Sequence, residues 1–365
     1  MYQTCEIMKQ RYLSLDIFRG LTVALMIIVN NPGLWEKTFP ILKHMPWDGC
    51  TPTDLVFPFF LFCVGVSMTF SFAKYASLDR KAVGKIFKRG ALIFLIGLII
   101  NAFPFEKHWL ESLRVFAVLQ RIAMCYVLAA VLALWLKTPK RILCAAGVLS
   151  FIHVAILLAF AGPEGAFTLE GCVARRIDVA LVGEAHVYHG YTFADGSAAP
   201  FDPEGLLGVL TGTCTALLGY LAGGILRKER PLSDRLVSLY TCAAVALALS
   251  QIVSIWIPIN KPLWSVSYVL YAGGWAMLVL AFITWVTDVK GWVKPFTPFR
   301  ALGMNPLAIY VLSSLVQKVI WSIGWDYGAV FGASEWMSLL YALIFLSFHL
   351  LVAMALYKKN IVIKL

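Results

Sequence analysis

The chain has 365 residues, of which 60% are hydrophobic and only 14% are charged, and its mean hydropathy is +0.78. Soluble domains carry about 25% charged residues, so this composition excludes a soluble globular protein and predicts an integral membrane protein. The net charge of +11 does not indicate a nucleic-acid partner, because basic cytoplasmic loops give membrane proteins the same excess.

Ten apolar runs approach or reach the roughly 20 residues that a helix needs to cross a hydrocarbon core. They lie at residues 15–35, 52–73, 90–104, 115–136, 142–161, 205–226, 236–257, 265–286, 301–322 and 336–357, and the third is the shortest. Lipid offers no hydrogen-bond partners to the backbone, and the runs are too continuously apolar for barrel strands. We therefore predict an all-α polytopic membrane protein with about ten transmembrane helices, folded as a single domain over residues 1–365.

The basic residues predict the orientation of these helices. With the N-terminus in the cytoplasm, 21 Lys and Arg residues fall in inside segments and 7 in outside segments. Positive charge concentrates on the cytoplasmic side, so both termini are predicted to be cytoplasmic. The connector at 36–51 and the long loop at 162–204 then face the extracytoplasmic side, and we expect the loop to fold over that outer face.

The cysteines and paired histidines predict no metal site. No C-x-x-C motif occurs among the eight cysteines, and most of them fall inside apolar runs as small hydrophobic residues. Cys50 and Cys172 are expected to face outward, and the sequence leaves open whether they form a disulfide. His186 and His189 form an H-x-x-H pair, but in a loop without a fixed helical phase.

Polar side chains inside apolar runs are costly, so each is a candidate functional residue. Asp16 and Arg19 lie three residues apart and can pair on one helix face, as a structural anchor or as part of a site. An arginine within the fourth run, Arg121 next to Gln120, must face an anion, and a ligand and an internal salt bridge remain equally open. Asn305 is expected either to hydrogen-bond between helices or to open a helix break that contacts a ligand.

The stretch from residue 30 to residue 60 carries the strongest candidate site. It joins the first two runs and places Asn30, His44 and Asp54 at or near their outer ends. A histidine exchanges a proton near neutral pH, and a carboxylate beside it orients the imidazole or stabilises its charged form. An asparagine amide can donate to a carbonyl oxygen that becomes negative. We predict that these three side chains converge near one face of the bilayer and form a catalytic site.

Motifs around these residues resemble a known family, that of heparan-α-glucosaminide N-acetyltransferase and its bacterial relatives. The resemblance appears in order from residue 13 to about 310. The matching motifs are Leu13-Ser14-Leu15-Asp16-Ile17-Phe18-Arg19-Gly20, Val29-Asn30, Lys43-His44 with Trp47-Asp48-Gly49, Asp54-Leu55-Val56-Phe57-Pro58, Leu119-Gln120-Arg121, Ile177-Asp178 through His186 and Tyr188, Asp202-Pro203-Glu204-Gly205, and Gly303-Met304-Asn305.

The resemblance implies an acyltransferase that moves an acetyl group from cytoplasmic acetyl-CoA to the amino group of a glucosamine-type sugar or glycan on the far side. His44 is then the general base or the acetyl carrier, with Asn30 and Asp54 beside it. Acetyl-CoA is expected as co-substrate, without a metal. The residues expected to bind substrate are Arg121, Gln120, Glu204, Asn305, Arg19, Trp47 and His186.

The resemblance also suggests a homodimer. The lysosomal enzyme's extracytoplasmic N-terminal domain has no counterpart here, which points to a multi-pass protein of the bacterial inner membrane. The alternative is a transporter or flippase for a sugar or lipid-linked glycan that uses the same intramembrane polar residues.

Overall fold

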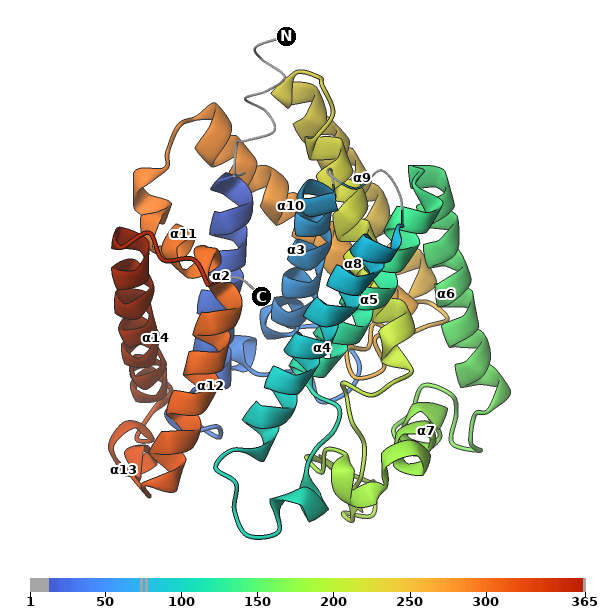
Figure 1. Ribbon diagram of the computed structural model, residues 1–365. Coiled ribbons are helices and arrows are strands. Elements are labelled where there is room, and N and C mark those ends of the chain that lie inside the picture. Colours follow the sequence, from blue (N-terminus) through green and yellow to red (C-terminus); the bar gives the residue numbers. More distant parts are fainter. Residues whose placement is uncertain (1–12, 73–74, 76–77, 364–365) are drawn as a thin grey trace.

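The computed structural model describes residues 13–72, 75 and 78–363, and helices dominate this part of the chain (Figure 1). Its two strands, β1 (Tyr191–Thr192) and β2 (Ala198–Ala199), pair antiparallel and are two residues long each. The predicted all-α polytopic class is therefore confirmed.

Each predicted run corresponds to a helix or to a bent pair of helices. The long helices are α2 (Leu13–Asn30), α3 (Val56–Ser71), α4 (Arg80–Ala102), α5 (Val118–Leu136), α6 (Pro139–Ala159), α8 (Gly208–Leu226), α9 (Leu232–Val253), α10 (Val266–Thr284), α12 (Pro306–Ser322) and α14 (Glu335–Lys358). Shorter ones are α7 (Val173–Val182), α11 (Thr297–Met304) and α13 (Tyr327–Phe331). Single turns occupy η1 (Pro40–Leu42), η2 (Pro52–Leu55), η4 (Trp109–Ser112), η5 (Glu184–His186), η6 (Trp285–Val289) and η7 (Lys294–Phe296).

Among the described helices, eight are long and apolar enough to cross a membrane, or nine if the bent pair containing α11 and α12 is one span. The one long described helix outside that group is α4, which contains the third predicted run. It begins at Arg80 rather than at residue 90, where Asp79 caps it by accepting from Ala82 N–H. Basic side chains on its exposed first turns hide this half of the helix from a hydropathy pattern.

The ninth predicted run, 301–322, is broken rather than straight. The helical segments Lys294–Met304 and Pro306–Ser322 meet at an angle of 76° around Asn305. A proline at the first position of a helix has no N–H to continue the preceding helix, which explains why the break falls there.

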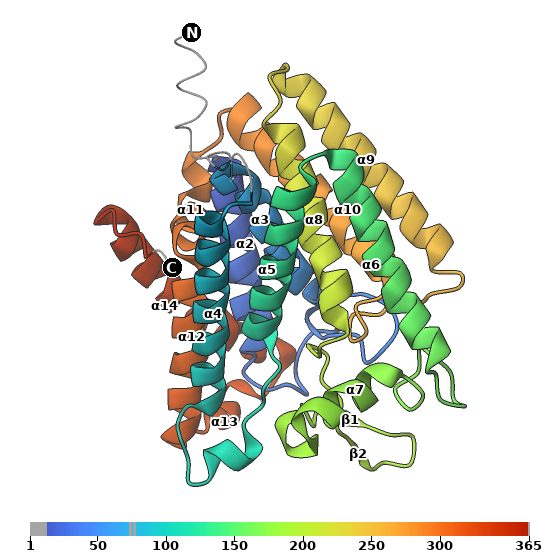
Figure 2. The same ribbon diagram turned by 45° about the vertical axis from the view of Figure 1, so that its right-hand side comes forward.

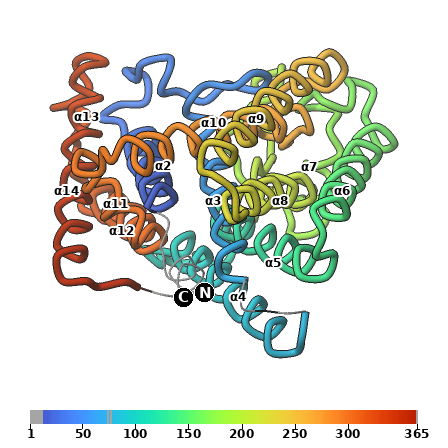
Figure 3. The backbone as a smooth tube through the Cα atoms, turned by 90° about the horizontal axis from the view of Figure 1, so that it is seen from above, coloured from blue at the N-terminus to red at the C-terminus, as the bar shows by residue number. Residues whose placement is uncertain are grey.

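Helices α3 and α8 lie near the middle of the bundle when it is seen from above, whereas α6, α9 and α14 lie at its edges (Figure 3). Glycines let α3 and α8 touch backbone to backbone. A Cβ atom on Gly65 would lie 1.8 Å from the carbonyl oxygen of Ala216, and one on Gly219 would lie 2.1 Å from that of Phe62. Such contacts between small residues are how helices pack closely in lipid.

The connections alternate between the two ends of the bundle, as the orientation prediction requires. Helices α5 and α6, and α8 and α9, are joined at the upper end, whereas α4 and α5, and α6 and α7, are joined at the lower end (Figures 1 and 2). The segment 162–204, with α7, β1 and β2, folds beneath the lower end (Figure 2). The site described next lies toward this end.

Candidate functional site

The connector between α2 and α3 carries a buried carboxylate, Asp54, whose two oxygens have different partners. Asp54 is 1% exposed and sits in the turn η2, which begins after Thr51. Its Oδ2 accepts hydrogen bonds from the backbone N–H groups of Met45 at 3.1 Å and Thr51 at 3.0 Å. Its backbone carbonyl accepts from Tyr268 Oη at 2.6 Å. These bonds fix the carboxylate, and Oδ1 remains for other partners.

His44 takes the remaining oxygen. Its Nδ1 lies 2.6 Å from Asp54 Oδ1, although the two residues are ten positions apart. Lys261, from the connector between α9 and α10, brings Nζ to 3.0 Å from His44 Nδ1 and to 3.5 Å from Asp54 Oδ1. The side chain of His44 is 42% exposed and that of Lys261 only 17%. Within the described part of the chain, Nε2 of His44 forms no hydrogen bond, so this nitrogen is available to a substrate.

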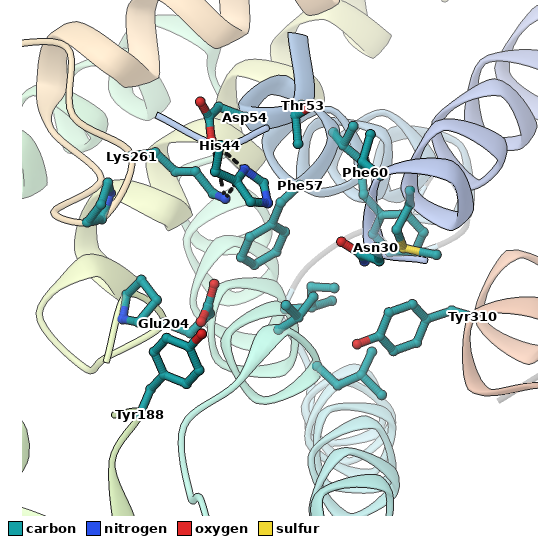
Figure 4. Close-up of a pocket in the computed structure, with 18 of the residues that line it drawn as sticks. Asn30, His44, Thr53, Asp54, Phe57, Phe60, Tyr188, Glu204, Lys261 and Tyr310 are labelled. Atoms are coloured by element: carbon teal, nitrogen blue, oxygen red, sulfur yellow. Dashed lines mark hydrogen bonds and ion pairs between the residues drawn. The ribbon is translucent and has the colours of Figure 1, made fainter. Parts of the chain in front are cut away.

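A cavity of about 330 Å³ opens beside this group. Lys261, His44 and Asp54 lie on one side of it, Asn30 and Tyr310 on another, and Glu204 and Tyr188 below (Figure 4). The rest of the wall is mostly apolar: Met26, Val29, Val56, Phe57, Phe60, Val118, Leu119, Ile122, Pro203 and Pro262. The three predicted catalytic side chains, from two helix ends and their connector, thus border one cavity.

The wall opposite His44 is held by an arginine with two carboxylates. Arg114 donates from Nε and one NH2 group to both oxygens of Asp202, at 2.9 and 2.7 Å, and the same NH2 group lies 2.5 Å from Glu204 Oε2. Its guanidinium stacks over the ring of Tyr188, 4.7 Å from the centroid. Burial opposes the charge of Glu204, but Arg114 outweighs it and lowers the pKa of this carboxyl, so Glu204 is an anion facing the cavity.

A neighbouring carboxyl behaves in the opposite way. Asp178, in α7, is 1% exposed, and its Oδ1 accepts from the N–H of Leu206 at 2.8 Å. Burial raises the pKa of Asp178 from 3.8 to about 7. It packs against Gly205, where a Cβ atom would lie 1.7 Å from Asp178 Oδ2. Asp178 therefore secures the turn before α8 and does not line the cavity.

Two smaller cavities adjoin the main one. A cavity of about 110 Å³ shares Phe60 and Ile122 with it, and Arg19 and Arg89 also line this smaller cavity. Another, of about 190 Å³, shares Asn30 and Tyr310 with it and is lined by α12. Hollow space thus continues from His44 toward the arginines, interrupted by the side chains of Phe60 and Ile122.

Gln120 and Arg121 are fully buried behind the cavity wall. Arg121 donates to the carbonyl of Gly205 at 2.6 Å and lies over Trp264, 5.2 Å from the ring centroid. It forms no ion pair with a described residue, so of the two open alternatives the internal salt bridge is not observed there, while its Nε and one NH2 group have no hydrogen-bond partner among the described residues. Gln120 packs against Gly97, and its amide has no hydrogen-bond partner among the described residues.

Other predicted substrate residues also hold the scaffold. Trp47 donates to the carbonyl of Phe167 at 2.7 Å, which ties the connector to the 162–204 segment. His186 binds the carbonyl of Leu113 through Nδ1 at 2.8 Å. Asn305, at the break before α12, donates to Ile361 O and accepts from Ile363 N–H. None of the three lines the cavities described above.

Arg19 does border the smaller cavity, and it pairs with Asp16 at 2.7 Å. Cys50 and Cys172 are both free thiols. Burial, reinforced by nearby Asp54, raises the pKa of Cys50 to about 12, so its thiolate form is rare at neutral pH. In the described ranges, no group of three or more His, Cys, Asp or Glu side chains is placed to hold a metal ion.

Sequence reasoning missed Lys261 and Arg114. Both were counted only as basic residues of outer connectors, although such a connector faces the same side as His44. Arg114 pairs with both carboxylates of the acidic motif at 202–204. An arginine in a short outer connector could have indicated such an ion pair.

Comparison with known proteins gives a consistent assignment. The family model described as "Heparan-alpha-glucosaminide N-acetyltransferase, catalytic" matches residues 11–169. Heparan-alpha-glucosaminide N-acetyltransferase of Mus musculus is 31% identical over 356 residues, covering 83% of this chain and 53% of the mouse protein. The Homo sapiens protein is 31% identical over 353 residues, covering 82% of this chain and 52% of the human protein. The chain thus spans about half the length of the curated relatives it matches.

A bundle of apolar helices, with a His–carboxylate pair beside an internal cavity, defines a polytopic membrane protein. The chain belongs to the heparan-alpha-glucosaminide N-acetyltransferase family.

Proposed function

We propose that this protein is a transmembrane N-acetyltransferase. It moves an acetyl group from cytoplasmic acetyl-CoA to the amino group of a glucosamine-type sugar on the extracytoplasmic side. The observation that carries the proposal is the 2.6 Å contact between His44 Nδ1 and Asp54 Oδ1 beside a cavity of about 330 Å³, with no described residue hydrogen-bonded to Nε2. A homodimer in a bacterial inner membrane belongs to the same proposal, on the family resemblance alone.

The arrangement suits general base catalysis. Asp54 accepts the Nδ1 proton of His44 and so selects the tautomer in which Nε2 carries a lone pair. The sugar's amine reacts in its neutral form: its nitrogen bonds to the acetyl carbon, Nε2 takes the proton that this nitrogen loses, and the carbon–sulfur bond breaks. The proton then passes to the departing sulfur. Asn30, in the same wall, is placed to donate to the carbonyl oxygen as it gains negative charge.

The two adjoining cavities suit acetyl-CoA, which supplies the thioester. Phosphates and a nucleotide suit a basic end, and Arg19 and Arg89 line the smaller cavity. The chain between the nucleotide and the sulfur needs a narrow path, and Phe60 and Ile122 stand where the two cavities meet. Further exposed basic residues occupy the first half of α4, the helix that contributes Arg89 to this cavity.

The acidic and aromatic wall fits the acceptor. Glu204 presents a carboxylate to the cavity, which attracts the ammonium group of an amino sugar. Tyr188 and Tyr191 lie in the same wall and offer ring faces and hydroxyl groups to a sugar. We therefore assign the acceptor to the side of the cavity formed by the 162–204 segment and the turn at Glu204.

Two routes use the same residues. In the ternary route, His44 is the base while both substrates are bound; in the covalent route, His44 itself carries the acetyl group and the kinetics are ping-pong. We favour the ternary route, because the acceptor wall and Nε2 border the same cavity. Incubation with radioactive acetyl-CoA without acceptor decides between them. No stable label is expected on His44, and a stable acetyl-His44 would overturn this preference.

The proposed function is tested by CoA release from purified protein given acetyl-CoA and a panel of amino sugars. We expect acceptor-dependent release that falls at least about 100-fold in His44→Ala, since positioned bases contribute that much. His108→Ala is the matched control, because His108 is an exposed outer histidine paired with Glu111. Release that survives His44→Ala would reject the site. No release with any acceptor would reject the enzyme and favour transport.

A further inference from the structure

Lys261 approaches the pair of His44 and Asp54 more closely than any role in substrate binding requires. Its Nζ lies 3.0 Å from His44 Nδ1 and 3.5 Å from Asp54 Oδ1, and the side chain is mostly buried. The sequence separation from His44 is 217 residues. In the described part of the chain, the close polar contacts of this ammonium group are those with this pair.

The loop that carries Lys261 is locked to the loop that carries His44. Asn260 and Asp48 form an antiparallel bridge, with Gly49 N–H donating to Ile259 O at 2.7 Å and Asn260 Nδ2 donating to Asp48 Oδ1 at 3.1 Å. Asn260 is fully buried, and its Oδ1 also accepts from Leu263 N–H. The ammonium group is therefore held in place by the fold and does not depend on a flexible side chain reaching across an open space.

The positions of the protons on His44 and Lys261 restrict how the ammonium group can act. When Nδ1 donates its proton to Asp54, it has no lone pair left, and an ammonium group has only donors. Lys261 therefore cannot hydrogen-bond to Nδ1 in this tautomer and acts through its charge. Protonation of Nε2 would place an imidazolium beside this ammonium group, which is unfavourable, whereas Asp54 alone would favour the imidazolium.

We propose that Lys261 is a positioning residue that holds Asp54 as the partner of His44 Nδ1–H and keeps the imidazole neutral, so that Nε2 remains available as a base. The effect of Lys261 on catalysis rests on the proposed function, whereas its effect on the charge of His44 can be tested without it. Arg114 cannot take this role, because Asp202 and Glu204 engage its guanidinium.

Other titratable groups line the cavity or lie on the connector that carries His44, and they also influence its charge. They are Glu204, Tyr188 and Tyr191 from the segment before α8, Arg114 from the connector before α5, Tyr310 from α12, and Lys43, Asp48 and Cys50 from the connector that carries His44. Each of them is unchanged in a Lys261 variant. A shift that follows the charge at position 261 therefore reports on this side chain.

The first test measures His44 directly. Diethylpyrocarbonate reacts with neutral imidazole. The folded protein is treated with it at a series of pH values, and mass spectrometry gives the pH at which modification of His44 is half-maximal. We expect this midpoint to rise in Lys261→Met and Lys261→Gln, where the neighbouring positive charge is lost, and to stay near the native value in Lys261→Arg. Lys43→Met is the control, since Lys43 adjoins His44 but its Nζ donates to Glu36 O. Two uncharged variants, each checked for native Tm, guard against misfolding of either one.

The second test uses acetyl transfer. The acid limb of the kcat/KM profile should move to higher pH by the same amount in Lys261→Met and return in Lys261→Arg. Loss of rate without movement of either midpoint would show a merely structural lysine and overturn the proposal. If the native protein transfers no acetyl group, the proposed function fails, and the modification midpoints still decide the role of Lys261.

Discussion

Asp54 illustrates how single atoms divide tasks in this site. Oδ2 is used by backbone N–H groups of its own connector, and Oδ1 is used by His44 and Lys261. A buried carboxylate with this many partners stays charged and fixed, which a base-orienting residue requires. Its position at the end of a turn that starts α3 ties the imidazole to a long helix rather than to a mobile loop.

Asp178 gives a prediction about stability. The folded protein binds its proton with a pKa of about 7, whereas the ordinary value is 3.8. The folded state therefore holds the proton more tightly than the unfolded state, and the free energy of unfolding should fall as pH rises from about 4 to about 7. Between pH 5 and pH 8, the free energy of unfolding of the native protein should fall by about 3 kcal/mol more than that of the Asp178→Asn variant.

Thermal unfolding in detergent at both pH values measures this difference. Other carboxylates titrate in both proteins, so the comparison between them isolates Asp178. Equal pH dependence of Tm in native protein and variant would contradict a buried, protonated Asp178.

At the level of side chains, the sequence predicted part of this site. Asn30, His44 and Asp54 were placed together because they stand at the ends of adjacent runs, and all three line one cavity. Lys261 was missed because only the bridge between Asp48 and Asn260 brings its connector to His44. Gln120 and Arg121 do not line this cavity, and their role in binding a ligand stays a prediction, because a hydropathy pattern does not reveal which face of a buried helix meets a cavity.

The contact between α3 and α8 is the element on which the site depends most. Helix α3 carries Phe57 and Phe60 into the cavity wall, and α8 follows the turn that holds Glu204. Their close approach requires glycine at the crossing, because a Cβ on Gly219 would lie 2.1 Å from Phe62 O. A backbone atom cannot move aside as a side-chain tip would.

Gly219→Ala should therefore destabilise the protein by at least about 2 kcal/mol and reduce acetyl transfer, since the helices must separate. Gly224→Ala, on the same helix, meets no atom within 4 Å and should leave Tm unchanged or raise it, as alanine favours helix. Tm and transfer rate of the two variants are compared side by side. Similar effects of both changes would show that the crossing tolerates a side chain.

Element boundaries show where hydropathy alone fails. The run at 90–104 marks only the second half of α4, because lysines and arginines occupy its exposed first turns. The run at 301–322 is continuous in hydropathy and yet bends by 76° at Asn305, where the proline that follows removes a backbone donor. Local chemistry, an aspartate cap and a proline, sets both boundaries.

For the whole molecule, the adjoining cavities bear on the proposed transfer between two compartments. The cavity beside His44 and the cavity beside Arg19 and Arg89 share Phe60 and Ile122, so these two side chains stand on the proposed path of acetyl-CoA. A larger ring at this point should obstruct the thioester but leave the acceptor wall unaltered.

Phe60→Trp should accordingly lower kcat/KM for acetyl-CoA by about tenfold, which corresponds to about 1.4 kcal/mol, and leave KM for the amino sugar nearly unchanged. Phe151→Trp is the control, because Phe151 on α6 is 74% exposed and lines neither of the two cavities. Steady-state kinetics with each substrate varied in turn make the comparison. An equal rise in KM for both substrates would argue against a separate path.

The most direct test of the central claim uses sealed proteoliposomes with an amino sugar trapped inside and radioactive acetyl-CoA added outside. We predict that acetylated sugar accumulates inside vesicles holding native protein, while acetyl-CoA itself stays outside, and that His44→Ala vesicles accumulate none. Transfer that occurs only when both substrates share one side of the membrane would contradict an imidazole that joins the two compartments.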